Sequence, residues 1–286
     1  MAGIHPSLYL DYSPVTGTRD AGRAWTSGSP APGLASVPDA LAATPDGGHL
    51  LALDRAGHVR IGTVQAGGTG GTGWATLGST RSLAAMAAGR ACRLTKLTAV
   101  AFSPAGVPLA AGDCSRAGTA GIFAYQGGSW YQAGPPLPTT VTGQDVGVLR
   151  LASAGGREVA VLQAGAGASA RLFVAWAAGG GRWTCSAAIT LTHGSVVTSS
   201  FGSGGSVAVA FAGGTGESVA GPAARWQQVP ALPPGRAVAL AQPPSGGLDA
   251  LAADGGELTV WRLRPDRAGW VRSQAISVPI QYGSSS

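Results

Sequence analysis

The sequence predicts an all-β fold, a β-propeller of about six four-stranded blades. Three observations predict this fold: tryptophans that return at near-regular intervals, short apolar or alternating runs between them, and 47 glycines in 286 residues. Short strands separated by turn residues at even spacing are typical of repeated β architectures. No long stretch has the apolar stripe of an amphipathic helix, and Arg81–Arg90 is the one short helix candidate.

Six of the eight tryptophans close similar units of the sequence. They are Trp25, Trp74, Trp130, Trp183, Trp226 and Trp270, and successive members lie 49, 56, 53, 43 and 44 residues apart. This spacing is close to the period of about 40–50 residues found in propeller blades. A buried tryptophan removes about 150–250 Å² from water, so we expect these repeat anchors to act as wedges between blades. The alternative is that they are core aromatics of a β-sandwich.

Each unit divides into four short strands with glycine-containing turns between them. The sixth unit predicts strands at Ala237–Ala241, Leu248–Ala252, Glu257–Leu263 and Trp270–Ser277. The second unit predicts Ala40–Thr44, His49–Leu53, His58–Val64 and a strand from Trp74, and the third predicts Thr98–Ser103, Leu109–Ala111, Ala120–Tyr125 and a strand at Trp130. Alternation along Glu257–Leu263 is the clearest strand signal in the chain.

We expect one domain over residues 1–286. Blade 1 takes residues 1–33 and 278–286, and blades 2 to 6 take 38–80, 96–138, 146–191, 195–233 and 236–277. Pairing of the two termini in blade 1 closes the ring and removes an exposed sheet edge. Only six residues precede Ser7–Tyr12, which fits a third strand, so we expect the natural product to begin upstream of Met1 with a signal or anchor.

Composition excludes several classes of partner. Apolar residues make up 45% of the chain, enough for a core, and charged residues only 11%. The net charge of +6 comes from scattered arginines, with Lys96 the one lysine, so we expect no nucleic-acid partner. The arginine, alanine and glycine bias is typical of a high-GC bacterial genome. No apolar stretch reaches the length of a membrane span.

The three cysteines are Cys92, Cys114 and Cys185. Their spacing matches no zinc motif. Cys92 precedes the first strand of the third unit and Cys114 follows its second strand, so a hairpin can bring them within disulfide distance; the alternative is a pair of buried thiols. A disulfide indicates an oxidising compartment, and we expect an extracellular or cell-surface location. Cys185 is expected to be a buried free thiol.

A short motif near the N-terminus resembles a known family. Thr18–Trp25 reads TRDAGRAW, the S/T-x-D-x-G-x-x-W pattern, which resembles the Asp-box (BNR) repeat of sialidase-like β-propellers. Pro265–Trp270 (PDRAGW) retains the Asp, Gly and Trp. The resemblance implies a structural box, made of Thr18, Asp20, Gly22 and Trp25, in the turn between the third and fourth strands. In it Asp20 accepts N–H bonds of its own turn and Trp25 packs between strands.

The resemblance does not extend to catalysis. A sialidase needs an arginine cluster, an acid and a tyrosine nucleophile, and no motif here matches the family's catalytic strands. Gly68–Gly73 reads GTGGTG but lies between two strands, whereas a dinucleotide site needs a following helix. His49 and His58 flank one hairpin without a third ligand. We therefore expect no catalytic residues, no metal and no cofactor.

We expect a non-catalytic, monomeric binding propeller whose ligand is a carbohydrate or a protein partner. The nominated ligand-binding residues follow the second strand of a unit and precede the third: Arg55, Arg116, Glu217 and Asp254. Each of them is also compatible with a solvated surface charge. Two alternatives remain. A glycoside hydrolase of sialidase type would show three arginines facing a tyrosine in the central funnel, and a structural ectodomain would follow a membrane anchor.

Overall fold

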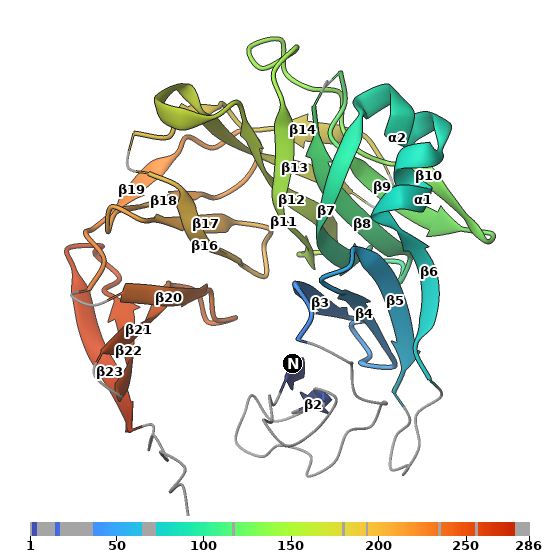
Figure 1. Ribbon diagram of the computed structural model, residues 1–286. Coiled ribbons are helices and arrows are strands. Elements are labelled where there is room, and N and C mark those ends of the chain that lie inside the picture. The colour runs from blue at the N-terminus through green and yellow to red at the C-terminus, as the bar shows by residue number, and fades with distance from the viewer. Residues whose placement is uncertain are drawn as a thin grey trace, which may run out of the picture. The chain divides into compact units, whose positions relative to one another are not determined.

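The computed structural model describes residues 2–4, 15–17, 37–64, 73–115, 118–178, 181–192, 194–233, 236–254 and 257–277. Within these residues most regular elements are strands in antiparallel sheets (Figure 1). The all-β prediction is confirmed. The chain divides into two units, Met1–Ala166 with Arg171–Cys185 and Gly167–Ala170 with Ser186–Ser286.

The first unit contains three groups of four antiparallel strands, and one pairing, of Cys114 with Val146, joins the second and third groups into a larger sheet. Their strands are β3 (Ala40–Ala43), β4 (His49–Leu53), β5 (His58–Thr63) and β6 (Ala75–Ser79); β7 (Leu94–Phe102), β8 (Pro108–Cys114), β9 (Ile122–Gln126) and β10 (Ser129–Gln132); and β11 (Val146–Ala154), β12 (Arg157–Ala164), β13 (Arg171–Ala178) and β14 (Trp183–Cys185). In each group the strands pair in chain order. A separate pair joins β1 (Ala2–Ile4) to β2 (Val15–Gly17).

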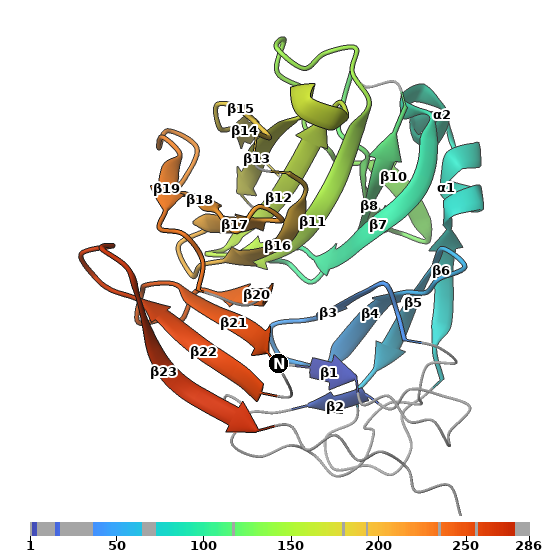
Figure 2. The same ribbon diagram turned by 60° about the vertical axis from the view of Figure 1, so that its left-hand side comes forward.

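The second unit contains two more sheets of the same kind (Figure 2). Their strands are β16 (Val196–Phe201), β17 (Val207–Phe211), β18 (Gly216–Val219) and β19 (Gln227–Val229); and β20 (Arg236–Ala241), β21 (Asp249–Asp254), β22 (Glu257–Leu263) and β23 (Trp270–Ser277). The short elements η1 (Gly167–Ser169) and β15 (Ile189–Thr190) complete the unit.

The strands predicted in the second, third and sixth units are present, three of them with the expected bounds and the others with shifted ends. β4, β22 and β23 match the prediction at both ends, and the segment after Gly73 leads into strand β6 rather than into a helix. The helix candidate is confirmed as α1 (Thr80–Ala85) and α2 (Ala87–Cys92), and Ser79 forms a capping box with Ser82 at its start. Residues 7–12, 18–25 and 278–286 lie outside the described residues, and with them the Asp-box and the expected ring closure.

The second strand of a sheet is buried on both faces. In β4, β8, β12 and β17 nearly every residue is buried, including Leu51, Ala110, Val161 and Val209. Continuous apolar runs of Val, Leu and Ala are typical of strands that are covered from both sides. The neighbouring first strand carries a bulge in four sheets, at Leu97/Ala99, Val148/Arg150, Val196/Thr198 and Ala237/Ala239. Bulges bend a strand and redirect its side chains.

Four of the recurring tryptophans make the same kind of hydrogen bond, from the indole N–H to a backbone carbonyl. The indole N–H of Trp130 donates to the Leu77 carbonyl at 3.0 Å, and that of Trp183 to Ala133 at 2.7 Å. In the second unit Trp226 donates to Ala187 at 2.8 Å and Trp270 to Pro230 at 3.2 Å. Each acceptor lies three or four residues beyond the preceding tryptophan of the series.

These tryptophans are less buried than their expected role as wedges requires. Trp130 is buried, whereas Trp183, Trp226 and Trp270 are only partly buried. Among the described residues the most deeply buried tryptophan is Trp176, which is not one of the six recurring tryptophans. At these positions the indole N–H therefore forms a hydrogen bond to the backbone in addition to the apolar contacts of the ring. Trp130 also needs Gly78 beneath it, since a Cβ there would lie 2.7 Å from the indole nitrogen.

Candidate functional site

Strand direction sorts the connections of each sheet onto two edges. In an antiparallel sheet the turn between the second and third strands lies at the same edge as the entry to the first strand and the exit from the fourth. We call this the loop edge, and the opposite one, with the two remaining hairpin turns, the hairpin edge. All four nominated residues were expected at the loop edge.

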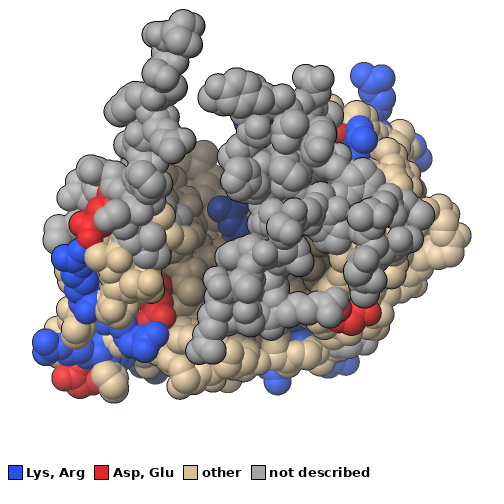
Figure 3. Space-filling model, turned by 90° about the horizontal axis from the view of Figure 1, so that it is seen from below, with Lys and Arg blue, Asp and Glu red and all other residues tan. Residues whose placement is uncertain are grey.

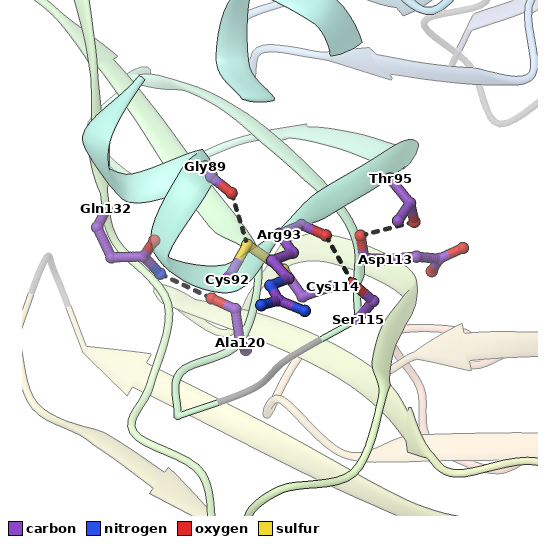
Figure 4. The surroundings of a disulfide bond; sticks show 9 residues. All are labelled: Gly89, Cys92, Arg93, Thr95, Asp113, Cys114, Ser115, Ala120 and Gln132. Carbon is purple, nitrogen blue, oxygen red and sulfur yellow. Dashed lines mark hydrogen bonds between the residues drawn. A yellow bond between two sulfur atoms is a disulfide. The ribbon is translucent and has the colours of Figure 1, made fainter. Parts of the chain in front are cut away.

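A disulfide fixes the loop edge of the β7–β10 sheet. Cys92, at the end of α2, bonds to Cys114, the last residue of β8, with the Cα atoms 5.2 Å apart. This pairing confirms the prediction. Beside it the Ser115 backbone N–H donates to the Arg93 carbonyl at 3.2 Å (Figure 4). The disulfide and this hydrogen bond thus join two connecting segments that are 22 residues apart in the sequence, next to the end of strand β8.

A hollow of about 390 Å³ opens beside this disulfide, between the loop edges of the β7–β10 and β11–β14 sheets. Its polar lining consists of Thr95, Asp113, Ser115, Asp145 and Gln163. These residues come from the start of a first strand, the end of a second strand or the adjoining connection. The hollow therefore lies at the edge that the sequence predicted for ligand binding.

Asp113 is the central polar group of this hollow. Its side chain points away from the disulfide in Figure 4, while Thr95 Oγ1 donates to its backbone carbonyl at 3.1 Å. The carboxyl packs on Gly147, where a Cβ would lie 2.5 Å from Oδ1. Within the described residues no hydrogen bond to this carboxyl is recorded. Burial raises the pKa of Asp113, and the positive charge of Lys96 offsets that effect only in part.

The nominated residues do not form this site. Arg55 is exposed in the turn between β4 and β5, as expected for the loop edge. Glu217 lies inside strand β18, opposite Val209 and Gln228, rather than in the preceding loop. Asp254 is the last residue of β21, and Arg116 falls outside the described residues. Glu217 was misplaced because the turn before β18 is shorter than expected.

A recurring polar residue was the signal that sequence reasoning missed. Asp54, Asp113 and Gln163 each follow the buried run of a second strand, in β4, β8 and β12. Asp54 is already satisfied, because it accepts from the His58 backbone at 2.9 Å and from Arg60 Nε at 3.0 Å. Only the second and third of these positions line the hollow.

Asp54 shows how partners change a carboxyl at this edge. Burial acts to raise its pKa, but hydrogen bonds from the His58 backbone and ring, with the charges of His58 and Arg60, outweigh it and lower the pKa. His49 lies at the other end of β4, so the two histidines of this hairpin do not meet. The Asp54 carboxylate is therefore already paired, with His58 and Arg60 of the same hairpin.

Three arginines meet in the second unit, at the hairpin edge. Arg262, Arg264 and Arg267 line a hollow of about 500 Å³ between the β16–β19 and β20–β23 sheets. Arg262 forms a bidentate pair with Asp249, and Arg267 donates to Gln227 Oε1 and Ser218 Oγ. Tyrosine is not among the described residues that line it, so these residues do not make the arginine–tyrosine arrangement that a sialidase requires.

The degenerate box PDRAGW lies in the turn between β22 and β23, where the resemblance places an Asp-box. Asp266 Oδ1 accepts from the Ala268 backbone N–H at 2.9 Å. This is the structural role that the resemblance implies for Asp20, which itself lies outside the described residues. Arg267 in this turn has a positive φ of 58°, which few side chains adopt without local support.

The part of the chain that the structure describes has no evident metal site and no membrane-spanning helix. In that part of the chain no group of three or more His, Cys, Asp or Glu side chains is placed to hold a metal ion. None of its helices has the length and hydropathy needed to cross a membrane. Cys185 is a free thiol of intermediate exposure, and burial raises its pKa.

The fold is similar to that of two known protein structures, although the sequence is not closely similar to either of them. No family model matches the sequence, and no curated protein matches it. The structure is similar to that of YCF48 bound to D1 peptide, with a TM-score of 0.51 and 12% identity over 83% of this chain and 66% of that one. It is also similar to a functionally unknown protein from Desulfotomaculum acetoxidans, with a TM-score of 0.55 and 11% identity over 96% and 80% of the two chains. At this identity the likeness shows the β-propeller fold.

Proposed function

We propose that this chain is a non-catalytic binding propeller that takes a segment of a protein partner at the hollow beside the Cys92–Cys114 disulfide. The observation that carries the proposal is the Asp113 carboxyl, which is half-buried in the hollow and has no recorded hydrogen bond within the described residues. Since this carboxyl is only partly buried and lines the hollow, a ligand that donates a hydrogen bond can reach it.

The lining favours a ligand rich in hydrogen-bond donors. The two carboxylates of Asp113 and Asp145 accept only, and Thr95, Ser115 and Gln163 add hydroxyl and amide groups. A peptide offers backbone N–H groups and basic side chains to such a surface. The YCF48 structure, which holds a D1 peptide, supports a peptide ligand by analogy of fold alone.

The disulfide supports the proposed binding site and also the proposed location of the protein. It holds α2 against the end of β8, so the hollow is preorganised before a ligand arrives. Disulfides persist in oxidising compartments, and we therefore extend the proposal to an extracellular or cell-surface protein. A six-bladed single domain with paired termini remains our proposal for the complete ring.

Selection from a phage-displayed peptide library, with a glycan array in parallel, tests this function. We expect enriched peptides that bind the wild type and lose at least about tenfold in affinity for Asp113→Asn, because a charge-assisted hydrogen bond of about 1.4 kcal/mol corresponds to that factor. The matched control is Asp39→Asn, an exposed aspartate outside the hollow, which is expected to bind like the wild type.

Two results would change the proposal. Ligands that bind Asp113→Asn as tightly as the wild type would show that the hollow is not the binding site. Glycans that bind the wild type and lose affinity for the variant would retain the site and replace the peptide by a carbohydrate, the other ligand class expected from the sequence.

A further inference from the structure

A second hollow of the first unit lies at the hairpin edge of the β7–β10 and β11–β14 sheets. Its volume is about 380 Å³, and Glu158, Tyr131, Trp183, Gln126 and Ser103 are among the residues that line it. Strand direction places it at the opposite edge from the disulfide and Asp113. It is therefore separate from the site proposed above.

Glu158 is the unusual residue of this hollow. Its exposed fraction is 6%, yet within the described residues its carboxyl has no hydrogen bond and no ion pair. It is also the one charged group among the lining residues that the structure describes. Acidic side chains are almost never this buried unless they are paired. The carboxylate oxygens of Glu158 are not among the fully enclosed polar atoms that lack a partner, so the end of the side chain opens into the hollow, where a ligand can reach it.

The position of Glu158 departs from the repeat. It is the second residue of β12, and the second residue is apolar in β4, β8 and β17, where it is Leu50, Leu109 and Ala208. An apolar residue would therefore serve packing at this place. Departures from a structural rule without a local compensation are expected at functional positions.

Two aromatic side chains accompany the carboxyl in this hollow. Trp183 comes from β14, and its ring is held by the bond from Nε1 to the Ala133 carbonyl at 2.7 Å. Tyr131 comes from β10 and is 56% exposed, although most large apolar or aromatic side chains of the described chain are buried. Indole and phenol faces attract cations.

We propose that this hollow binds an organic cation, an ammonium or a guanidinium group, through Glu158, Trp183 and Tyr131. The carboxylate supplies the opposite charge on the wall of a hollow, where the attraction between charges is stronger than on an open surface. The aromatic rings contact the alkyl chain and the positive charge of the ligand. A lysine or arginine side chain of a partner and a free amine share this chemistry.

Titration of the ¹⁵N-labelled protein, followed by NMR, tests the proposal. The probes are the peptide acetyl-Gly-Ser-Lys-Ser-Gly-amide, its arginine and acetyl-lysine versions, and 1,6-diaminohexane. We expect the lysine and arginine peptides or the diamine to shift the Trp183 indole N–H signal and the Glu158 amide signal, and acetyl-lysine to shift neither. The tighter of the peptide and the free diamine identifies the source of the cation.

Variants distinguish binding from a structural role. Glu158→Gln keeps the shape of the side chain and removes its charge, and we expect the affinity for the cationic probe to fall at least about tenfold. Tyr131→Ala, at an exposed position, is expected to weaken binding as well. The matched control is Glu257→Gln, which lies in the second unit and pairs with Arg272, and it is expected to bind like the wild type.

Equal affinity of Glu158→Gln and the wild type for the lysine peptide would overturn the proposal. So would the absence of any shift at Trp183 and Glu158 with all four probes. Neither result bears on the Asp113 hollow, because the two sites lie at opposite sheet edges and are tested with different variants.

Discussion

Three carboxyl groups of the first unit show that partners, rather than residue type, decide how an acid behaves. Asp54 has hydrogen bonds from His58 and Arg60, and its pKa is lowered. The carboxyls of Asp113 and Glu158 accept no hydrogen bond from the described residues, and burial raises the pKa of each. The first carboxyl stabilises a turn, while the other two remain available for ligands.

Glu158→Gln is expected to stabilise the folded protein at neutral pH by up to about 1 kcal/mol, because burial disfavours the charged carboxylate and the amide carries no charge. The pKa of Glu158 is raised on folding, so the folded state binds more protons between the ordinary value of 4.5 and the raised value. The stability of the wild type therefore falls as the pH rises through this window.

Urea unfolding of both proteins at several pH values measures this effect. The advantage of Glu158→Gln should shrink as the pH falls and vanish below the ordinary glutamate pKa, where both side chains are neutral. A stability difference that does not change with pH, or a variant less stable than the wild type at pH 7, would mean that the Glu158 carboxylate has a partner in the folded protein.

At the residue scale the sequence predicted the cysteine pair but not the ligand-binding residues. The disulfide could be predicted because a hairpin fixes where Cys92 and Cys114 lie relative to each other. Asp113 and Glu158 could not, because their importance depends on which sheet packs against them and on the absence of a partner there. A charged residue in a predicted loop, such as Arg55, shows neither which sheet packs against it nor whether it has a partner.

At the element scale the tryptophan hydrogen bonds account for the repeat. Each indole reaches a carbonyl three or four residues beyond the previous tryptophan, in Trp130, Trp183, Trp226 and Trp270. An intact N–H to carbonyl bond fixes the distance between successive fourth strands more closely than apolar contact alone. The spacing of the tryptophans was therefore more informative than their hydrophobicity.

Trp130→Phe is expected to destabilise the protein by about 1–3 kcal/mol, since it removes the donor to Leu77 and leaves a cavity. Trp261→Phe is the matched control, because the buried Trp261 Nε1 has no hydrogen-bond partner among the described residues. Its replacement removes an unsatisfied donor, so we expect a smaller loss or a gain. Equal losses for the two variants in thermal unfolding would show that the hydrogen bond contributes nothing beyond packing.

Strand boundaries were predictable where the side chains alternate and the turns contain glycine. β22 and β23 follow such a pattern and have the expected limits. β7 begins at Leu94 rather than at Thr98, because bulges at Leu94/Lys96 and Leu97/Ala99 interrupt the alternation without ending the strand. A bulge shifts the pattern of buried residues by one position, so the sequence underestimated the length of this strand.

At the scale of the whole molecule the chain presents a weakly charged surface. Among the coloured residues of Figure 3, basic and acidic atoms occur in small groups, often next to each other and beside uncharged residues. Ion pairs such as Arg60–Asp54, Arg262–Asp249 and Arg272–Glu257 also join neighbouring opposite charges. Such a surface is not expected to attract a highly charged partner over a long range. Local hollows that contain unpaired polar groups are better candidates for ligand binding.

Amide hydrogen exchange, measured with and without a peptide selected on the wild type, tests the central claim most directly. We predict slower exchange at residues 113–115 and 145–149, which border the Asp113 hollow, and unchanged exchange at the hairpin edge around Glu158. Protection confined to other segments, with the amides around Asp113 unaffected, would contradict the proposal that this loop edge is the binding site.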